Sequence, residues 1–511
     1  MNKIFILSAL CLFSVLTNAN DLEEKSIQLS NQRGTTYEIL NHISDLSGYL
    51  FMYDSQDINS NRKVKIPAGT YSLKEAIIFA TGDQNINIKV FGNHILLYKK
   101  TEEITQSKTF NSQLSILNSI ITLEGTVKER DTGEPVANCT ISILETGMGI
   151  IANKEGKFLL KVPDSLKNTY LHFSHLGYKS QLVPIPLLAE NKVDVFLDTH
   201  YIPLETVVIR INNPYKLMKD MIDAREKNYY DEPHYITTFY REGLNRKNDF
   251  SNLTEGVFQV YKPGYSAQQP DIVKMIKMRN IYNHQENDFV MIKMQAGLNA
   301  CLTLDIIKIL PDFLSFDNEN MYNYANTGMA MIDNRLAYVI SFEQKPGINW
   351  CLYKGEMYID SDNYALLQVN FQLHPDYISQ SAPMLVVKRS KNVTITPQEA
   401  CYSVTYKNFD GKYFINHIRG DLKFNIRKKK IISESSTFYT WFEMVTCKID
   451  TDNVKRFPIR ESQPTRNILS DTKYIYDASF WESFNFITPE EKLSDAFLRI
   501  NAKIEESRVV D

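Results

Sequence analysis

Histidine is the side chain most often used for proton transfer and metal binding at neutral pH, and it occurs nine times in the sequence. His172 and His175 form the only close pair, and residues three apart on a strand point to opposite faces, so they cannot readily share a metal ion. We interpret this pair as structural or surface residues. None of the nine lies in an HExxH or HxxE pattern: His42, His94, His172, His175, His200, His234, His284, His374 and His417.

Other catalytic signatures are missing as well. The sequence contains no GxSxG nucleophile motif, no Walker phosphate loop, no CxxC pair and no dinucleotide-binding glycine pattern. We therefore predict that the protein is not an enzyme, and we assign no catalytic residue, no cofactor site and no metal site. A hydrolase assembled from distant Ser, Asp and His residues is the weakest alternative.

Two charged segments resemble binding sites but are better explained as turns. Asp360, Asp362 and Asn363 resemble the start of a calcium loop, yet the glycine at its sixth position and the glutamate at its twelfth are absent. The basic run 427–430 fits a solvated hairpin tip, with contact to lipid phosphate as the alternative.

The overall composition excludes some partners. The chain has 511 residues, 43% of them apolar, which is enough for about three domains with their own cores. The formal net charge is −3, so there is no overall basic field to attract nucleic acid or anionic lipid. We predict no nucleic-acid partner.

The N-terminus has the pattern of a secretory signal peptide, predicted at residues 1–19. Lys3 precedes the apolar run 4–16, which is too short to span a bilayer, and Ala19 ends a small-residue cleavage pattern. No later stretch approaches 18 apolar residues, so we predict no transmembrane span. We expect an exported protein of the periplasm, with a position peripheral to the outer membrane as the alternative.

Five cysteines follow the signal peptide. Because the number is odd, at least one thiol must be free or intermolecular, although disulfides between the others are possible. Five are too few to act as the scaffold, so hydrophobic cores must stabilise the fold. The residues are Cys139, Cys301, Cys351, Cys401 and Cys447.

Residues 21–100 predict a small α+β domain. Thr35 with Glu38 and Ser72 with Glu75 match capping boxes, and Gly48 and Gly82 are placed to end the two helices. Short strands are predicted at 49–53, 63–66, 86–90 and 94–98, the last two forming a hairpin around Gly92 and Asn93.

The segment 49–98 resembles the short N-terminal (STN) domain shared by secretins and TonB-dependent signal transducers. In that family the domain is a periplasmic protein-binding module, and in transducers it meets a sigma regulator. The resemblance implies an envelope protein as partner, such as a sigma regulator or a TonB-system component.

A polar linker is predicted at 101–119, followed by a β-sandwich at 120–208. Short alternating strands with turns about every ten residues predict seven strands and no helix. Gly125-Thr126-Val127, Thr132-Gly133-Glu134-Pro135, Asn153 with Gly156-Lys157-Phe158, and Gly177-Tyr178 resemble the carboxypeptidase regulatory-like domain, a transthyretin-like sandwich. That domain is an accessory module, and the resemblance implies no peptidase activity.

The segment 204–209 is similar to the end of this module in large outer-membrane receptors of the Bacteroidetes type. There a plug and barrel of several hundred residues follow, whereas only about 300 residues follow here. The chain thus resembles a Bacteroidetes envelope protein without the TonB-dependent receptor barrel.

The remaining residues predict a linking helix at 212–230, capped by Asn213 and Pro214, and a β-rich C-terminal domain at 233–511. We expect a large antiparallel meander with hairpin turns at 360–363, Asp410-Gly411 and 427–430, and a final helix starting at Thr488-Pro489. The whole chain is thus predicted to be multidomain and mainly β.

These features favour a non-enzymatic adaptor of the Gram-negative envelope that works through protein contacts, possibly linked to TonB-type transport or signalling. The alternative is a lipid or lipoprotein carrier, because a curved sheet with a helix across it could enclose an acyl chain.

Overall fold

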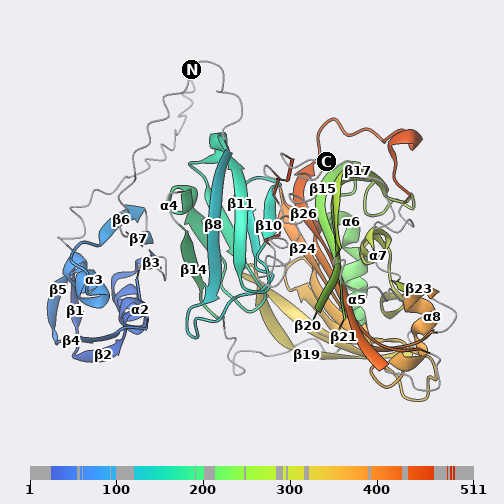
Figure 1. The fold of residues 1–511 in the computed structure, drawn as a ribbon, viewed down its shortest axis with the longest axis horizontal. Helices are drawn as coiled ribbons and strands as arrows, with labels where there is room; N and C mark the ends of the chain where they lie inside the picture. Colours follow the sequence, from blue (N-terminus) through green and yellow to red (C-terminus); the bar gives the residue numbers. More distant parts are fainter. Residues whose placement is uncertain are drawn as a thin grey trace, which may run out of the picture. The chain divides into compact units, whose positions relative to one another are not determined.

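The computed structural model describes residues 25–53, 58–59, 61–91, 94–98, 120–189, 192–200, 213–246, 249–282, 292–294, 297–315, 321–389, 393–428, 435–464, 480–481, 484–485 and 487–488. The predicted signal peptide, the Gly92-Asn93 turn, the 101–119 linker, the segment 204–209 and the C-terminal helix after Thr488 lie outside these residues. The chain divides into two compact units, 1–126 with 162–168 and 183–196, and 127–161 with 169–182 and 197–511. It is mainly β (Figure 1).

The N-terminal module consists of short strands and two helices. Its sheets have the orders β1-β5, β2-β4 and β3-β7-β6, and the β6–β7 hairpin is antiparallel as predicted. The strands β1, β2 and β5 were not predicted; the sequences of β2 and β5, QRGT and GTYS, lack the alternation of aliphatic residues that indicates a strand. The elements are β1 (Ser26–Leu29), β2 (Gln32–Thr35), α2 (Thr36–Ser47), β3 (Leu50–Tyr53), β4 (Lys63–Ile66), β5 (Gly69–Ser72), α3 (Leu73–Thr81), β6 (Asn87–Phe91) and β7 (His94–Tyr98).

Both predicted capping boxes are present. The Thr35 and Ser72 hydroxyls accept from the amides of Glu38 and Glu75, whose carboxylates accept from the cap amides in return. The helices end at Gly48 and Gly82, whose φ angles of 75° and 63° favour glycine. The buried helix faces, including Ile43 and Ile77, form the core of this unit with the strands.

Residues 120–197 contain seven strands in two sheets, of orders β10-β9-β12-β13 and β11-β8-β14. The prediction of no helix was wrong, because α4 (Ile185–Ala189) follows β13 and buries Ile185, Leu187 and Leu188. The strands are β8 (Ile120–Glu129), β9 (Thr140–Ile143), β10 (Gly149–Ile151), β11 (Lys157–Pro163), β12 (Tyr170–Ser174), β13 (Gln181–Pro184) and β14 (Val193–Leu197).

The predicted linking helix is capped by Asn213, whose side chain accepts from the Lys216 amide. It is divided at Ala224 into α5 (Pro214–Asp223) and α6 (Arg225–Asn228). The α5 helix buries Leu217, Met218 and Met221.

A ten-stranded antiparallel sheet dominates the second unit. Its order is β17-β16-β15-β26-β25-β24-β22-β21-β20-β19, which confirms the predicted large antiparallel sheet. The prediction did not include the pairing of β15 with β26, which lies far along the chain. The predicted turns at 360–363 and Asp410-Gly411 do join neighbouring strands. The strands are β15 (His234–Arg246), β16 (Asp249–Lys262), β17 (Ile272–Tyr282), β19 (Tyr322–Ile332), β20 (Arg335–Gln344), β21 (Tyr353–Asp360), β22 (Leu366–Leu373), β24 (Val393–Phe409), β25 (Lys412–Lys428) and β26 (Ser435–Asp450).

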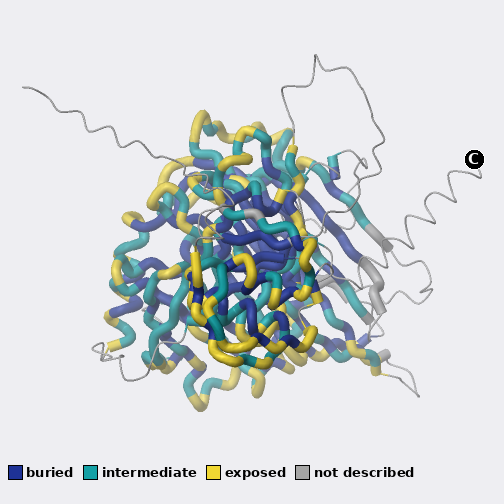
Figure 2. The backbone as a smooth tube through the Cα atoms, turned by 90° about the vertical axis from the view of Figure 1, so that its left-hand side faces the viewer, coloured by how far each residue is buried: buried dark blue, intermediate teal, exposed yellow. Residues whose placement is uncertain are grey.

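One face of this sheet carries the main core. Helix α5 and the helix α7 (Leu298–Thr303) pack on this face, as does Phe313, whose ring stacks on Phe342 at 4.3 Å between centroids. Figure 1 shows α5, α6 and α7 beside the long strands, and Figure 2 shows the buried stretches of the chain in dark blue. Smaller elements are the pair β18 (Ile292–Met294) and β23 (Val386–Arg389), and the helix α8 (Ala382–Leu385). We call the face of the ten-stranded sheet that carries α5 and α7 the helix-covered face, and the opposite face the strand face.

Candidate functional site

A continuous row of polar residues crosses the strand face from one edge strand to the other. Every neighbouring pair in the row is a register pair of adjacent strands, so the side chains lie next to each other on one face. From β17 to β19, this polar row consists of Arg279, Glu255, Arg241, Glu443, Arg419, Ser403, Asn370, Glu356, Ser341 and Ala325.

The first half of the polar row is buried and alternates in charge. Arg241 Nε donates to Glu443, Arg419 Nη1 lies 3.2 Å from the other Glu443 oxygen, and Arg279 Nη2 lies 2.5 Å from Glu255. The Arg241 and Glu443 side chains are each 1% exposed. Burial opposes ionisation of Glu443, but Arg241 and Arg419 outweigh it and hold its pKa well below the usual value. In this half each arginine pairs with a carboxylate, and the second Glu255 oxygen has no hydrogen-bond partner among the described residues.

Part of the sandwich and the described residues 480–481, 484–485 and 487 cover this buried half. Ile151 packs with Trp481 and Ile487 against strand residues such as Val445 and Cys447. Arg279 lies 4.3 Å from the Trp481 ring centroid, and Arg241 Nη1 donates to the Ile487 carbonyl at 3.5 Å. The charges are therefore sealed by the chain itself.

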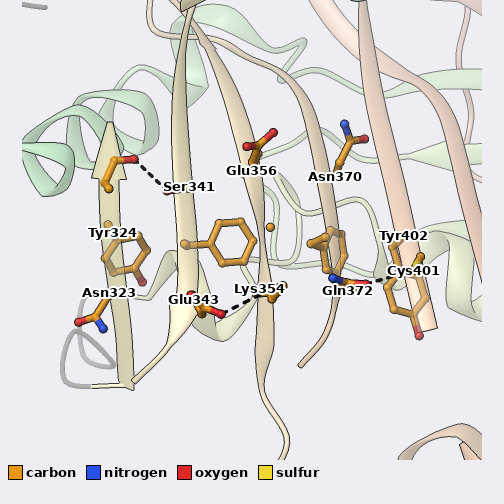
Figure 3. Close-up of a pocket in the computed structure, with 14 residues that line it drawn as sticks. Asn323, Tyr324, Ser341, Glu343, Lys354, Glu356, Asn370, Gln372, Cys401 and Tyr402 are labelled. Atoms are coloured by element: carbon orange, nitrogen blue, oxygen red, sulfur yellow. Dashed lines mark hydrogen bonds and ion pairs between the residues drawn. The ribbon is translucent and has the colours of Figure 1, made fainter. Parts of the chain in front are cut away.

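The second half of the polar row lies open. Across β19 to β24 the strand face forms a polar trough with a volume of about 580 Å³. Ala325 and Glu356 are exposed, and Ser403 donates to Asn370 at 2.8 Å. Its polar lining includes Asn323, Ser341, Glu343, Lys354, Glu356, Asn370 and Gln372 (Figure 3).

A second row runs beside the first along the polar trough. Glu343 lies 3.6 Å from Lys354 and 3.4 Å from the ring of His374, and Cys401 donates to Gln372 at 3.5 Å. Figure 3 shows Glu343, Lys354 and Gln372 in one row and Ser341, Glu356 and Asn370 in the next. The trough thus offers amides, hydroxyls and both signs of charge, which suit hydrogen bonding to a polar chain better than bond-making chemistry.

The helix-covered face also holds buried charges, but they are mutually paired. Lys262 Nζ lies 2.7 Å from Asp271 and 2.8 Å from Asp305, and Lys308 also contacts Asp271. The Tyr406 hydroxyl donates to Asp305 at 2.9 Å. We interpret this cluster as structural.

His172 and His175, the close pair in the sequence, contact different partners. His172 Nε2 contacts Asp333 at 2.9 Å, whereas His175 Nδ1 contacts the Leu176 carbonyl at 2.9 Å. His234 is fully buried among Tyr230, Tyr265 and Phe414, and burial lowers its pKa to about 4. Among the described residues, no group of three or more His, Cys, Asp or Glu side chains is arranged to hold a metal ion.

The calcium-like segment is a turn, as predicted. Asp360 Oδ1 accepts from the amides of Asp362 and Asn363, and its other oxygen contacts Arg335. The carboxylate is therefore occupied by its own chain. Of the 427–430 segment, residues 429 and 430 lie outside the described part, so its tip stays a prediction.

All five predicted mature cysteines are free among the described residues. Burial raises the pKa of the Cys447 thiol to about 12, so this thiol is inert in the native fold. In the same described residues, no helix has the length and apolar character to cross a membrane.

Sequence reasoning missed both the polar row and the trough. The row is assembled from residues far apart in the sequence. Arg241 and Glu443, for example, are 202 positions apart and become neighbours through the pairing of β15 with β26. The signal that could have found the exposed half is the alternation of polar residues along β20, β21 and β22.

Comparisons with known proteins support one domain. No curated protein matches the chain. Two solved structures show limited similarity. A DUF1329 family protein from Desulfovibrio piger is 11% identical, and the match covers 47% of this chain and 93% of that chain with a TM-score of 0.19. A putative membrane-associated protein of unknown function from Bacteroides fragilis is 7% identical, and the match covers 65% of this chain and 99% of that chain with a TM-score of 0.13. TM-scores this low do not establish a shared fold. Residues 123–209 match the CarboxypepD_reg-like domain model, so this part of the chain is a carboxypeptidase regulatory-like domain.

Proposed function

We propose that the protein is a non-enzymatic adaptor of a Gram-negative cell envelope that binds an extended polypeptide segment of a partner in the polar trough. The observation that carries this proposal is the division of the polar row. Its buried half is paired and sealed by the chain itself, whereas its open half faces a trough of about 580 Å³.

The chemistry of the trough supports a polypeptide ligand. Amide and hydroxyl groups such as those of Asn370, Gln372 and Ser341 can both donate and accept hydrogen bonds, as peptide groups require. Lys354 and Glu343 add one charge of each sign, which suits a segment of mixed charge.

The accessory modules support the same proposal. The regulatory-like domain brings no reaction with it, and the N-terminal module resembles a periplasmic protein-binding domain. Together with the predicted signal peptide, these features favour a location in the periplasm, and a second contact to a sigma regulator or TonB-system component through residues 21–100.

Site-specific photo-crosslinking tests the trough. A photoreactive residue at exposed Ala325, inside the trough, should yield one discrete adduct with an envelope protein, whereas the same residue at Asp362, whose side chain is 79% exposed outside the trough, should not. Glu356→Lys in the Ala325-labelled protein should abolish the adduct. Equal labelling at both positions, or an adduct that survives Glu356→Lys, would contradict the proposal.

Two further measurements separate the parts of the proposal. Pull-down from envelope extract with and without residues 21–100 should show a partner that depends on the N-terminal module. Native mass spectrometry of the purified protein should show no bound acyl lipid, and finding one would favour the lipid-carrier alternative.

A further inference from the structure

A second cavity lies inside the larger unit, where strands β9 and β12 of the sandwich approach β24 and β25 of the sheet. Its volume is about 120 Å³, which is room for several water molecules at about 10–15 Å³ each. Thr140 and His175 line it from the sandwich, and Thr405, Lys407 and Asn416 line it from the sheet.

Lys407 lines this cavity, and no carboxylate of the described residues pairs with it. Its ammonium donates to the Thr446 carbonyl at 3.0 Å, and the described residues provide no carboxylate within ion-pair distance of it. Burial lowers the pKa of Lys407 to about 8, with a nearby thiol, Cys447, as the only opposing group. Two of the three ammonium hydrogens thus stay available to a ligand.

Two threonine hydroxyls are prepared as donors. The Asn416 amide donates to Thr140 Oγ1 at 3.0 Å and to Thr405 Oγ1 at 3.3 Å. Each hydroxyl therefore acts as an acceptor toward Asn416, and its own hydrogen stays available. Asn416 itself is 3% exposed, so this bridge between sandwich and sheet is held in place.

His175 supplies an acceptor. Because its Nδ1 faces the Leu176 carbonyl, which can only accept, the hydrogen resides on Nδ1 and Nε2 is bare. Burial lowers the pKa of His175, so the ring is neutral at pH 7. The cavity lining thus combines one uncompensated cation, two hydroxyl donors and one acceptor.

The other charged groups of the lining are already paired. Arg419 is held by both oxygens of Asp421 and by Glu443, and His417 lies 3.4 Å from Glu443. Asp333, the carboxylate in the lining, contacts His172 at 2.9 Å. Lys407 is the cation of the lining that has no carboxylate partner among the described residues.

We propose that this cavity is a binding site for a small oxyanion of the phosphate type. The Lys407 ammonium neutralises the anion, the Thr140 and Thr405 hydroxyls donate to its oxygens, and His175 Nε2 accepts from its P–OH group. The acceptor distinguishes phosphate, which carries a proton at pH 7, from sulfate, which does not. The inference concerns a site separate from the polar trough and does not depend on the proposed adaptor function.

Calorimetric titration of the full-length mature protein with inorganic phosphate, at constant ionic strength in chloride buffer, tests the site. We expect saturable binding, at least tenfold weaker binding of sulfate, and a melting temperature that rises with phosphate. Lys407→Met should weaken phosphate binding at least tenfold. It should also raise the melting temperature without phosphate, because it removes a half-buried charge that has no carboxylate partner, so loss of binding cannot be attributed to misfolding.

Two matched variants complete the test. Lys423→Met removes an exposed lysine of the neighbouring strand β25, paired with Glu399, and should leave phosphate affinity within twofold. Thr405→Val should weaken binding, and Thr405→Ser should restore it. Absence of saturable binding, or equal loss in the Lys407 and Lys423 variants, overturns the site. Equal affinity for sulfate and phosphate overturns the role of His175 and the assignment to phosphate.

Discussion

At the scale of single residues, the buried half of the polar row shows how charges are retained inside a sheet. Glu443 lies between Arg241 and Arg419, so each arginine has a carboxylate oxygen to bond. Desolvating three charges is costly, and only their mutual attraction and good geometry offset that cost. Removing the central member should therefore harm stability more than removing an exposed charge.

We expect Glu443→Gln to lower the free energy of unfolding by about 3–5 kcal/mol, because two buried guanidinium groups lose their carboxylate. Urea denaturation of the full chain measures the change. The matched control is Glu399→Gln on β24 of the same sheet, whose ion pair with Lys423 is exposed and should contribute no more than about 1 kcal/mol. Similar losses in both variants would show that the network does not stabilise the sheet.

The same residue predicts part of the acid sensitivity. The pKa of Glu443 is well below its ordinary 4.5 in the folded state, so its stabilisation is fully present above about pH 4.5 and is lost as the pH falls toward the lowered value. Urea midpoints measured from pH 7 to pH 3 should therefore fall more steeply for the native protein than for Glu443→Gln. Parallel pH profiles would contradict an ionised Glu443.

At the scale of elements, what could be predicted depended on how far apart the interacting residues lie in the chain. The capping boxes of α2 and α3 are complete within four residues, and both were predicted correctly. The turn at Asp360 is local in the same way. The pairing of β15 with β26 joins Arg241 to Glu443 across 202 positions, and no local pattern encodes that register.

The polar trough escaped prediction for the same reason. Ser341, Glu356 and Asn370 each look like ordinary solvent-facing positions of an amphipathic strand. They become one surface only when β20, β21 and β22 align in register. The strands β2 and β5 were missed because their sequences, QRGT and GTYS, contain no alternating aliphatic residues.

The caps give a prediction at this scale. Ser72→Ala should destabilise α3 by about 1 kcal/mol, because the Glu75 amide loses its acceptor. Glu75→Gln should cost less, since a glutamine side chain can still accept from the Ser72 amide and preserve the box. Hydrogen exchange of the amides of residues 73–81 measures both, and faster exchange in the glutamine variant than in the alanine variant would contradict the capping account.

At the scale of the whole molecule, the larger unit depends on how closely part of the sandwich packs on the strand face. The Lys161 amide donates to Asn485 Oδ1 at 2.5 Å, and Asn485 Nδ2 donates back to the Lys161 carbonyl at 2.9 Å. On the other side, the Gly177 amide donates to the Met331 carbonyl at 2.9 Å. These contacts hold the sandwich over the buried half of the polar row and do not cover the polar trough.

Gly147 is where this packing is closest. A Cβ at Gly147 would lie 2.8 Å from the Ile449 carbonyl oxygen, which is part of strand β26 and cannot move aside cheaply. Gly147→Val should therefore loosen this contact and expose Cys447, which is 4% exposed and lies two residues before Ile449 on β26. We expect the maleimide labelling rate at Cys447, measured by peptide mass spectrometry, to rise at least tenfold. Gly133→Asn is the control, because that turn glycine has a φ of 74° that asparagine tolerates and no atom within 4 Å of an added Cβ. If the two variants label Cys447 at the same rate, the close approach of Gly147 to β26 does not protect the strand face.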